Sequence, residues 1–288
     1  MIVVTGATGQ LGRLVVESLL TRVPATGLAV SVRDPDKAKD FAARGVRVRR
    51  GDFTDAVSLK QSLEGATQVL LISSNAAAYG GDTLAQHRLA IDAIKASGAR
   101  RVVYTSQMAA NVKSHFAPAV HHAQTEEMIG ASGLKWTSLR NGFYATAAIR
   151  HLGQAVATGT LRTTPTGKCA WTTHVDLADA AAAVLVNEGQ FEGPTPPLTA
   201  RQAVDFTELC TIASELLGRP IRHDVVTEEQ LSAALAAAGS PPQVARISIG
   251  MFRAANAGEF SAIDPTLEKL IGRQPATIRE AMAEHFRK

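Results

Sequence analysis

Residues 4–13 read VTGATGQLGR, and this stretch decides the fold. Gly6, Gly9 and Gly12 recur at intervals of three, directly after an apolar run that begins at Ile2. A glycine-rich turn between a strand and a helix lets the backbone approach a pyrophosphate, and the helix N-terminus offers free N–H groups there. We therefore expect Gly6 to make a tight turn, Gly9 to allow close approach and Gly12 to let the helix pack on the strand.

The spacing G-x-x-G-x-x-G differs from the G-x-G-x-x-G of ordinary dehydrogenases. A turn made of glycines for its own sake is the alternative interpretation. The position of the motif, between the first strand and the first helix, favours dinucleotide binding. Thr8 and Gln10 can add polar contacts.

Apolar runs of strand length alternate with amphipathic segments of helix length over the first half of the chain. We expect strands near 2–6, 28–32, 46–53, 68–74, 101–106 and 135–141, with helices near 10–23, 34–45, 55–65, 82–98 and 118–132. Buried strands that alternate with helices predict an α/β fold, with a doubly wound parallel sheet of the Rossmann type.

The rhythm changes after about residue 145. Helical segments predominate there, with strand-like pieces near 197–200 and 221–226. The sequence therefore predicts an NADP-binding domain over residues 1–145. Residues 146–288 form mainly a smaller, mostly helical C-terminal substrate lobe, and some of its segments return to the main domain. The HVDLAD stretch at 174–179 predicts a helix start capped by Asp176.

Composition excludes several classes of protein. The 288 residues are 45% hydrophobic, and the net charge of +4 is not gathered into a basic stripe with a nucleic-acid motif. No apolar stretch is long enough to span a membrane, and no signal peptide is expected. Cys169 and Cys210 are the only cysteines, which fits a reducing cytoplasm. No metal site is expected, because the histidines lack a ligand spacing such as H-E-x-x-H.

The tips of the second and third strands indicate which dinucleotide binds. An acidic residue at the second tip selects NAD, whereas an arginine accommodates the 2′-phosphate of NADP. Arg33 occupies this tip, and we assign Asp34 to the cap of the following helix. Asp52 could accept from the adenine amino group and Phe53 could pack on the adenine, although a simple turn with a buried Phe is the alternative. The sequence therefore predicts NADP(H) as the cofactor.

Several motifs together resemble a known family. VTGATGQLG, VRDP, GDF, LLISS, VVYTS, LRNGFY and LEKLIGRQPATIRE are similar to segments of the NmrA-like atypical short-chain dehydrogenase/reductases. Within that family the resemblance is strongest to the bacterial NADPH:quinone oxidoreductases and to triphenylmethane reductase. It covers nearly the whole chain, and LRNGFY and LEKLIG are its more specific parts.

The larger superfamily works with a Tyr-x-x-x-Lys pair on the helix after the fifth strand. If Glu126 is aligned with the glutamate that follows that lysine, His122 takes the lysine position and Pro118 the tyrosine position. Both catalytic residues are therefore absent. A standard alcohol–ketone dehydrogenase is excluded, and sugar-nucleotide epimerase chemistry is disfavoured.

The absent tyrosine would have been the proton donor, and its absence limits which substrates can be reduced. Ketone reduction makes an alkoxide whose conjugate acid has a pKa of roughly 16, as for bulk water. Quinone reduction makes a phenolate-like oxygen with a conjugate-acid pKa near ~10, a difference worth roughly 8 kcal/mol. A triarylmethane cation accepts hydride at carbon and needs no proton. The absence therefore favours quinones or cationic dyes, or no catalysis at all.

We expect His122, Asn141 and Tyr144 to be the catalytic residues. His122 could hydrogen-bond the ribose or donate a proton near neutral pH, and a surface pair with Glu126 is the alternative. The resemblance implies that the LRNGFY loop closes beside the nicotinamide, where Asn141 would supply an amide contact. Phe143 and Tyr144 would form an apolar wall against water, although a turn that packs both aromatics into the core is the alternative.

Carboxyl ends of parallel strands line the ligand crevice, so the residues there are expected to touch the cofactor. Ser106 matches the catalytic serine of the superfamily, although without the tyrosine that role is open. The predicted cofactor contacts are Gly6, Ala7, Thr8, Gly9, Gln10, Leu11, Gly12, Arg33, Asp52, Phe53, Ile72, Ser73, Ser74, Tyr104, Thr105, Ser106, Leu139, Asn141, Gly142 and Phe143.

Two functions stay open at this point. The first is an NADPH-dependent reductase that transfers hydride to a small flat acceptor such as a quinone. The second is an NADP(H)-binding redox sensor of the NmrA type with little or no catalysis. The sequence does not fix the oligomeric state, and a homodimer is left open.

Overall fold

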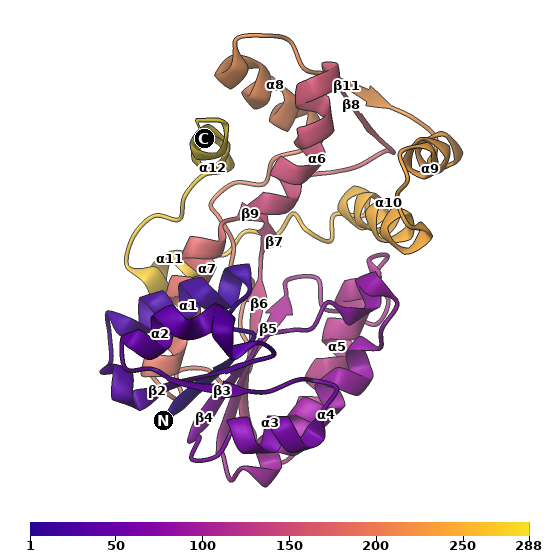
Figure 1. Cartoon of the computed structure of the whole chain (residues 1–288). Helices are drawn as coiled ribbons and strands as arrows, with labels where there is room; N and C mark the ends of the chain where they lie inside the picture. Colours follow the sequence, from indigo (N-terminus) through magenta and orange to yellow (C-terminus); the bar gives the residue numbers. More distant parts are fainter. Residues whose placement is uncertain (288) are drawn as a thin grey trace.

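A seven-stranded parallel sheet forms the centre of the computed structural model, which describes residues 1–287 (Figure 1). The strand order is β10-β6-β5-β4-β1-β2-β3, and every neighbouring pair is parallel. From β1 the chain builds outward in one direction through β2 and β3, and then in the other through β4, β5 and β6. The order reverses between β1 and β4, and ligands bind at such switch points. The predicted doubly wound fold is confirmed.

The strands of this sheet are β1 (Ile2–Thr5), β2 (Leu28–Val32), β3 (Arg47–Arg50), β4 (Gln68–Leu71), β5 (Arg101–Gln107), β6 (Lys135–Asn141) and β10 (Gly193–Pro194). Two small pairs lie outside it, β7 (Phe143–Tyr144) with β9 (Trp171–Thr172), and β8 (Thr160–Thr163) with β11 (Arg222–Val225).

The helices of the first half are α1 (Gln10–Leu20), α2 (Lys39–Ala43), α3 (Ala56–Ser62), α4 (Thr83–Ala96) and α5 (Ala117–Gly130), with 3₁₀ turns at Ala25–Gly27, Pro35–Ala38 and Ala76–Tyr79. Those of the second half are α6 (Ala145–Thr158), α7 (His174–Val186), α8 (Phe206–Leu217), α9 (Glu228–Ala237), α10 (Pro242–Asn256), α11 (Thr266–Ile271) and α12 (Ile278–Phe286).

Helices cover both faces of the sheet, and this is why the central strands β1, β2, β4 and β5 are buried at every residue. The burial pattern of β1 alternates between two cores: Val4 packs with residues of α1 and α7, while Val3 packs with residues of α3 and α4. Figure 1 shows α1, α2 and α7 on one face and α3, α4 and α5 on the other. A strand buried on both faces loses the polar–apolar alternation of a half-exposed one.

A third core holds the C-terminal lobe together. Its centre is an aromatic group formed by Trp171, Phe206, Phe252 and Phe260, enclosed by α6, α8, α10 and α12. Not all of the second half belongs to it. Helix α7 packs on α1, α11 packs on α7, and β10 pairs with β6, so these segments return to the main body. The boundary at residues 145/146 stays a prediction.

Three local expectations differ from the structure. The helix expected over 34–45 is a 3₁₀ turn followed by the short α2, because the Asp34 side chain accepts from the N–H of Asp36 and closes a tight first turn. The piece near 197–200 is no strand and contributes one bridge, from Leu198 to Asn141. The cap of α7 is Thr173, not Asp176.

Asp176 has a different role from the one expected. Its carboxylate is buried and accepts from the guanidinium of Arg273 and from the N–H of Ala276 at 2.9 Å. It therefore ties the start of α7 to the segment between α11 and α12.

Candidate functional site

The glycine turn follows β1 at the switch point of the sheet, and Gly9 and Gln10 are exposed there. Gly6 has φ +61°, a left-handed conformation that favours glycine, and its N–H donates to the Ser31 carbonyl at 3.0 Å. Gly9 is the N-cap of α1 and supplies no side-chain cap. A Cβ on Gly12 would lie 2.4 Å from the Gly6 carbonyl oxygen. Gly12 therefore serves helix–strand packing, as expected from the sequence.

The first turn of α1 leaves N–H groups unpaired. Helices cannot bond their first N–H groups internally, and no acidic residue stands in this turn to occupy them. Among residues 1–287, no protein group accepts from the N–H of Gln10, Leu11 or Gly12. This end of α1 fits a pyrophosphate, because it offers free donors, a positive dipole end and no side chain at Gly9.

Arg33 is the free cation beside this turn. Within the described part of the chain it forms no hydrogen bond or ion pair, whereas Arg13 pairs with Asp40 and Arg50 with Asp55. The carboxylate of Asp34 is engaged as a cap by the N–H of Asp36 at 3.1 Å. An unpaired guanidinium next to an occupied carboxylate fits a phosphate better than a free ribose hydroxyl.

The third strand tip is a compact turn. Asp52 accepts from both the N–H and the hydroxyl of Thr54, at 2.9 and 2.8 Å, and the backbone bond lowers the pKa of its carboxyl. Phe53 is half-buried and packs on the core beside α3 and α4. Both observations describe the local turn, so the contacts of Asp52 and Phe53 with adenine stay predictions.

Buried hydroxyls hold the chain in place just beyond β4. The Thr5 hydroxyl accepts from the N–H of Ile72 at 3.0 Å, and the Thr105 hydroxyl accepts from the N–H of Ser73 at 2.9 Å. The N–H of Ser74 donates to Nε2 of His87 at 2.8 Å. These bonds fix the predicted contact residues Ile72, Ser73 and Ser74 at the carboxyl edge of the sheet.

His122 lies at this edge, hydrogen-bonded to Tyr104. The Tyr104 hydroxyl is 2.8 Å from Nδ1 of His122 and 3.4 Å from the Ser73 hydroxyl. Burial lowers the pKa of His122 to about 4 and raises the pKa of Tyr104. His122 is therefore neutral near pH 7, which favours a hydrogen-bonding role over the proton donor that the sequence left open.

Other predicted contacts turn their side chains inward. The Ser106 hydroxyl donates to Glu126 at 2.7 Å, as does Ser138, and Arg140 pairs with the same carboxylate at 2.7 Å. Glu126 thus joins β5, β6 and α5 instead of forming a surface pair with His122. Three of the predicted contacts have almost wholly buried side chains: Tyr104, Ser106 and Leu139. These side chains pack inside the protein beneath the carboxyl edge of the sheet.

The loop after β6 divides its two aromatic residues between two environments. A Cβ on Gly142 would lie 2.3 Å from the Thr172 hydroxyl, so the chain can pass this point only as glycine. The Phe143 ring packs in the lobe core, 4.6 Å from Phe260 between centroids. The Tyr144 ring lies 4.2 Å from that of His174. Burial raises the pKa of Tyr144, and a hydrogen bond from Asn141 opposes that rise.

Sequence reasoning missed two side chains of this region, Gln107 and His174. Gln107 ends β5 directly after the quoted VVYTS motif, and His174 begins α7 in the HVDLAD stretch, which was expected only to start a helix. Among the described residues, three buried polar atoms of this region have no partner: Gln107 Nε2, Asn141 Oδ1 and His174 Nδ1. The end of a strand was a usable signal for Gln107, but burial without a partner is visible only in the fold.

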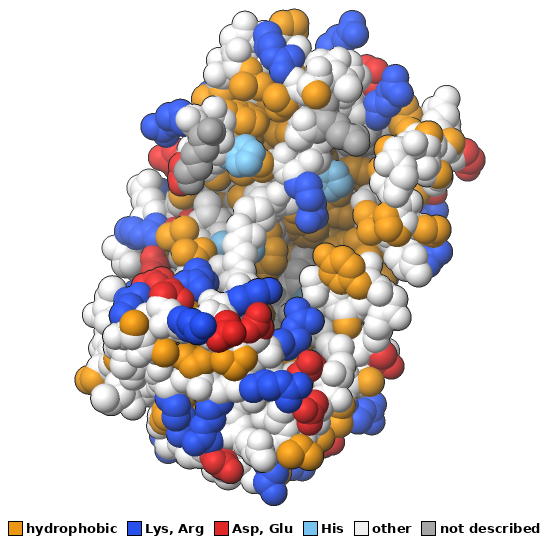
Figure 2. All heavy atoms as spheres, viewed as in Figure 1, with side chains coloured by type: hydrophobic (Ala, Val, Ile, Leu, Met, Phe, Trp, Pro, Cys, Tyr) orange, Lys and Arg blue, Asp and Glu red, His pale blue; other side chains and the backbone are white. Residues whose placement is uncertain are grey.

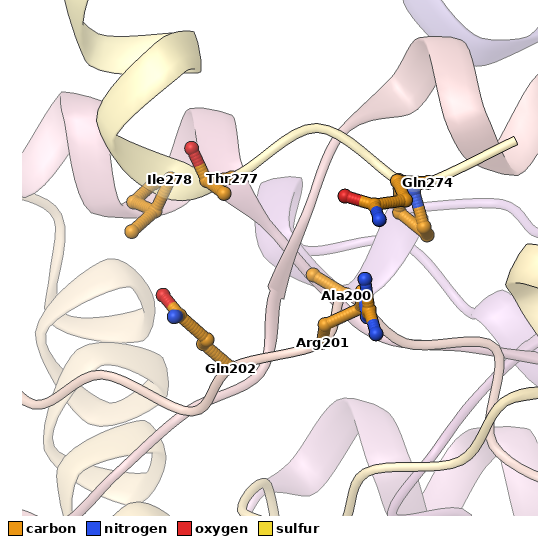
Figure 3. Close-up of a pocket in the computed structure, with 7 residues that line it drawn as sticks. Ala200, Arg201, Gln202, Gln274, Thr277 and Ile278 are labelled. Atoms are coloured by element: carbon orange, nitrogen blue, oxygen red, sulfur yellow. The ribbon is translucent and has the colours of Figure 1, made fainter.

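Figure 2 shows a hollow on one face between the main body and the lobe, with hydrophobic side chains gathered along it. A different depression, of about 340 Å³, lies near the start of α12 and is lined by residues such as Gln202, Gln274, Thr277 and Ile278 (Figure 3). None of the predicted site residues lines that depression. We therefore place the candidate site at the carboxyl edge of the sheet, where the glycine turn lies.

No helix among the described residues is long and apolar enough to cross a membrane. The described residues also contain no group of three or more His, Cys, Asp or Glu side chains that could hold a metal ion.

Two buried histidines, His87 and His174, and two partly buried ones, His122 and His151, predict an acid-sensitive fold. Burial lowers the pKa to about 3 for His87 and to about 4 for His122, His151 and His174. In the unfolded chain each takes up a proton near pH ~6.5, whereas in the folded chain each stays neutral until lower pH. Their contribution is therefore complete above about 6.5 and is lost as the pH falls toward 4.

We expect the free energy of unfolding to decrease between pH 7 and pH 5, by several kcal/mol for the four groups together. Urea titrations at pH 8, 7, 6 and 5 would measure it. This interval lies above the titration of ordinary carboxyls, which isolates the histidines. An unchanged free energy over that range would contradict the prediction.

Known proteins share this architecture along the whole chain. The model of the NmrA-like family matches residues 1–280. Quinone oxidoreductase 2 of Escherichia coli is 36% identical over 287 residues, which cover 99% of each chain.

Two solved structures share the fold over the whole chain. The NADPH-dependent quinone oxidoreductase of Escherichia coli, complexed with NADPH, superposes with a TM-score of 0.93 at 35% identity, covering 99% of this chain and 100% of that one. The triphenylmethane reductase of Citrobacter sp., complexed with NADP(H), superposes with a TM-score of 0.89 at 33% identity, covering 99% of both.

Proposed function

This chain belongs to the NmrA-like family, and from that premise we propose that it is an NADPH-dependent reductase that transfers hydride to a quinone or a similar conjugated acceptor. The observation that carries the proposal is the open glycine turn beside the unpaired Arg33, at the switch point of the sheet. The similarity of the whole chain to an NADPH-dependent quinone oxidoreductase supports the same reaction.

The residues present fit the cofactor. NADPH, when bound, supplies the hydride. The N–H groups at the start of α1 bind its pyrophosphate and Arg33 binds its 2′-phosphate. His122, neutral and joined to Tyr104, offers its remaining ring nitrogen to the ribose. Asn141 at the end of β6 and Tyr144 in β7 would lie where the nicotinamide and the acceptor meet.

The chemistry does not require a strong acid. Pro118 stands where the superfamily has its tyrosine, and His122 is largely unprotonated near pH 7 because burial holds its pKa at about 4. A quinone oxygen becomes phenolate-like, so its charge needs roughly 8 kcal/mol less neutralisation than an alkoxide. Positioning of donor and acceptor then supplies most of the rate.

The test is steady-state NADPH oxidation by the purified protein with benzoquinones, naphthoquinones and a triarylmethane dye. Turnover with at least one acceptor is expected. Clear NADPH binding without turnover on any acceptor would favour the redox-sensor alternative instead.

Arg33→Ala is expected to weaken the binding of NADPH much more than the binding of NADH, because a charge-assisted pair with the 2′-phosphate is lost. The expected difference is about 2 kcal/mol, or ~30-fold in the dissociation constant. Dissociation constants for both cofactors would be measured by titration. Arg44→Ala is the matched control, because Arg44 is also exposed but pairs with Glu17. Equal losses for both cofactors would contradict the assignment.

A cytoplasmic location is part of the proposal, supported by two buried, unpaired cysteines that suit a reducing compartment. A homodimer stays a prediction that light scattering on the purified protein would check.

A further inference from the structure

Two amide side chains lie side by side at the carboxyl edge of the sheet, each with one atom unused. Gln107 and Asn141 are register partners across β5 and β6, so their side chains emerge on the same face of the sheet. Gln107 is 8% exposed and Asn141 is 2% exposed. Within residues 1–287, Gln107 Nε2 and Asn141 Oδ1 have no hydrogen-bond partner, and no bond joins the two amides.

The unused atom differs between the two amides. The Gln107 Oε1 accepts from the N–H of Ala109 at 2.7 Å, so the amide nitrogen is the unused atom. At Asn141 the amide oxygen is the buried atom that has no partner among the described residues. The result is one buried donor beside one buried acceptor.

Such a pair is complementary to a primary carboxamide. A primary amide has a carbonyl oxygen that accepts and an NH₂ group that donates. The oxygen of a quinone only accepts, so a quinone would satisfy Gln107 and leave Asn141 unpaired. Leaving buried polar groups unpaired costs free energy, and therefore a ligand that pairs both atoms is preferred.

We propose that Gln107 and Asn141 together bind the carboxamide of the nicotinamide ring. The Gln107 Nε2 donates to its carbonyl oxygen, and its NH₂ group donates to Asn141 Oδ1. The inference rests on the proposed function, because it deepens the assignment of the same cofactor site. Both are positioning residues, since the carboxamide fixes the rotation of the ring that carries the hydride.

Binding measurements with three ligands test the pair without reference to turnover. The ligands are NADPH, its 3-acetylpyridine analogue, which keeps the carbonyl but replaces NH₂ by methyl, and adenosine 2′,5′-bisphosphate, which lacks the ring. The wild type should bind the analogue about 10-fold more weakly than NADPH, the size of one neutral hydrogen bond. Asn141→Leu should lose this preference.

Gln107→Met should weaken the binding of NADPH and of the analogue alike, by about 10-fold, because both ligands keep the carbonyl. The bisphosphate should bind unchanged. Gln68→Met is the matched control: Gln68 is also buried with one unpartnered amide atom, but it begins β4 at the opposite edge of the sheet. All three ligands should bind that variant as they bind the wild type.

The inference is overturned if the wild type binds NADPH and its analogue equally, a comparison that needs no variant to fold. It is also overturned if Gln107→Met keeps full NADPH affinity, or if that variant binds the bisphosphate as much more weakly as it binds NADPH. The expected binding pattern without quinone turnover would support the carboxamide contact and overturn only the reductase proposal.

Discussion

Gly9→Val should abolish measurable NADPH binding while the chain still folds, a loss of more than ~100-fold or about 2.8 kcal/mol. Gly9 has an ordinary backbone conformation, with φ −79°, and its position at the start of α1 is exposed. A branched side chain there would fill the space in which the backbone meets the pyrophosphate. Fluorescence titration with NADPH, together with a thermal unfolding curve, would measure both effects.

Two variants calibrate this result. Gly9→Ala should cost less, because its single Cβ would lie 3.3 Å from the Gly6 carbonyl oxygen and needs only a small adjustment. Gly12→Val should destabilise the fold itself, since its Cβ would lie 2.4 Å from the same oxygen. Wild-type affinity in Gly9→Val would mean that the glycines serve only the turn.

Asn141→Leu is expected to reduce quinone turnover by more than the ~10²-fold that a small misplacement of reacting groups can cost. Asn141 is buried at the end of β6, and its amide oxygen has no partner in the part of the chain that the structure describes. Leucine would place an apolar branch where that amide orients the nicotinamide. The kcat for NADPH oxidation with a saturating quinone would measure the loss.

His122→Ala is the comparison for this variant. It should lower kcat less, within about 10²-fold, because a neutral histidine with a pKa near 4 contributes a hydrogen bond and little acid catalysis. If the His122 variant lost more than the Asn141 variant, proton delivery would dominate the rate, contrary to a mechanism in which positioning supplies most of it.

Local sequence was sufficient for the sheet and for the glycine turn. Apolar runs bounded by glycine and by caps specify strands and helices through neighbours close in the chain, and β6 was predicted with its observed bounds, Lys135–Asn141. The same holds for the tip at Arg33 and for the Asp34 cap, which depend on residues one or two positions apart. The family resemblance, which the comparisons confirm, also rested on short continuous motifs.

Tertiary structure alone decided how these side chains are used. Ser106 matches a catalytic position in sequence, yet its hydroxyl donates to Glu126, twenty residues away. Tyr104 lies at the predicted edge, yet its ring is buried behind His122. Gln107 became a candidate cofactor contact only in the folded structure, where the register of β5 and β6 places it beside Asn141. The sequence determined which residues reach the carboxyl edge of the sheet, because strand ends are local. Which of them face a ligand and which face one another depends on register and on helix packing, and those arise from contacts between residues far apart in the chain.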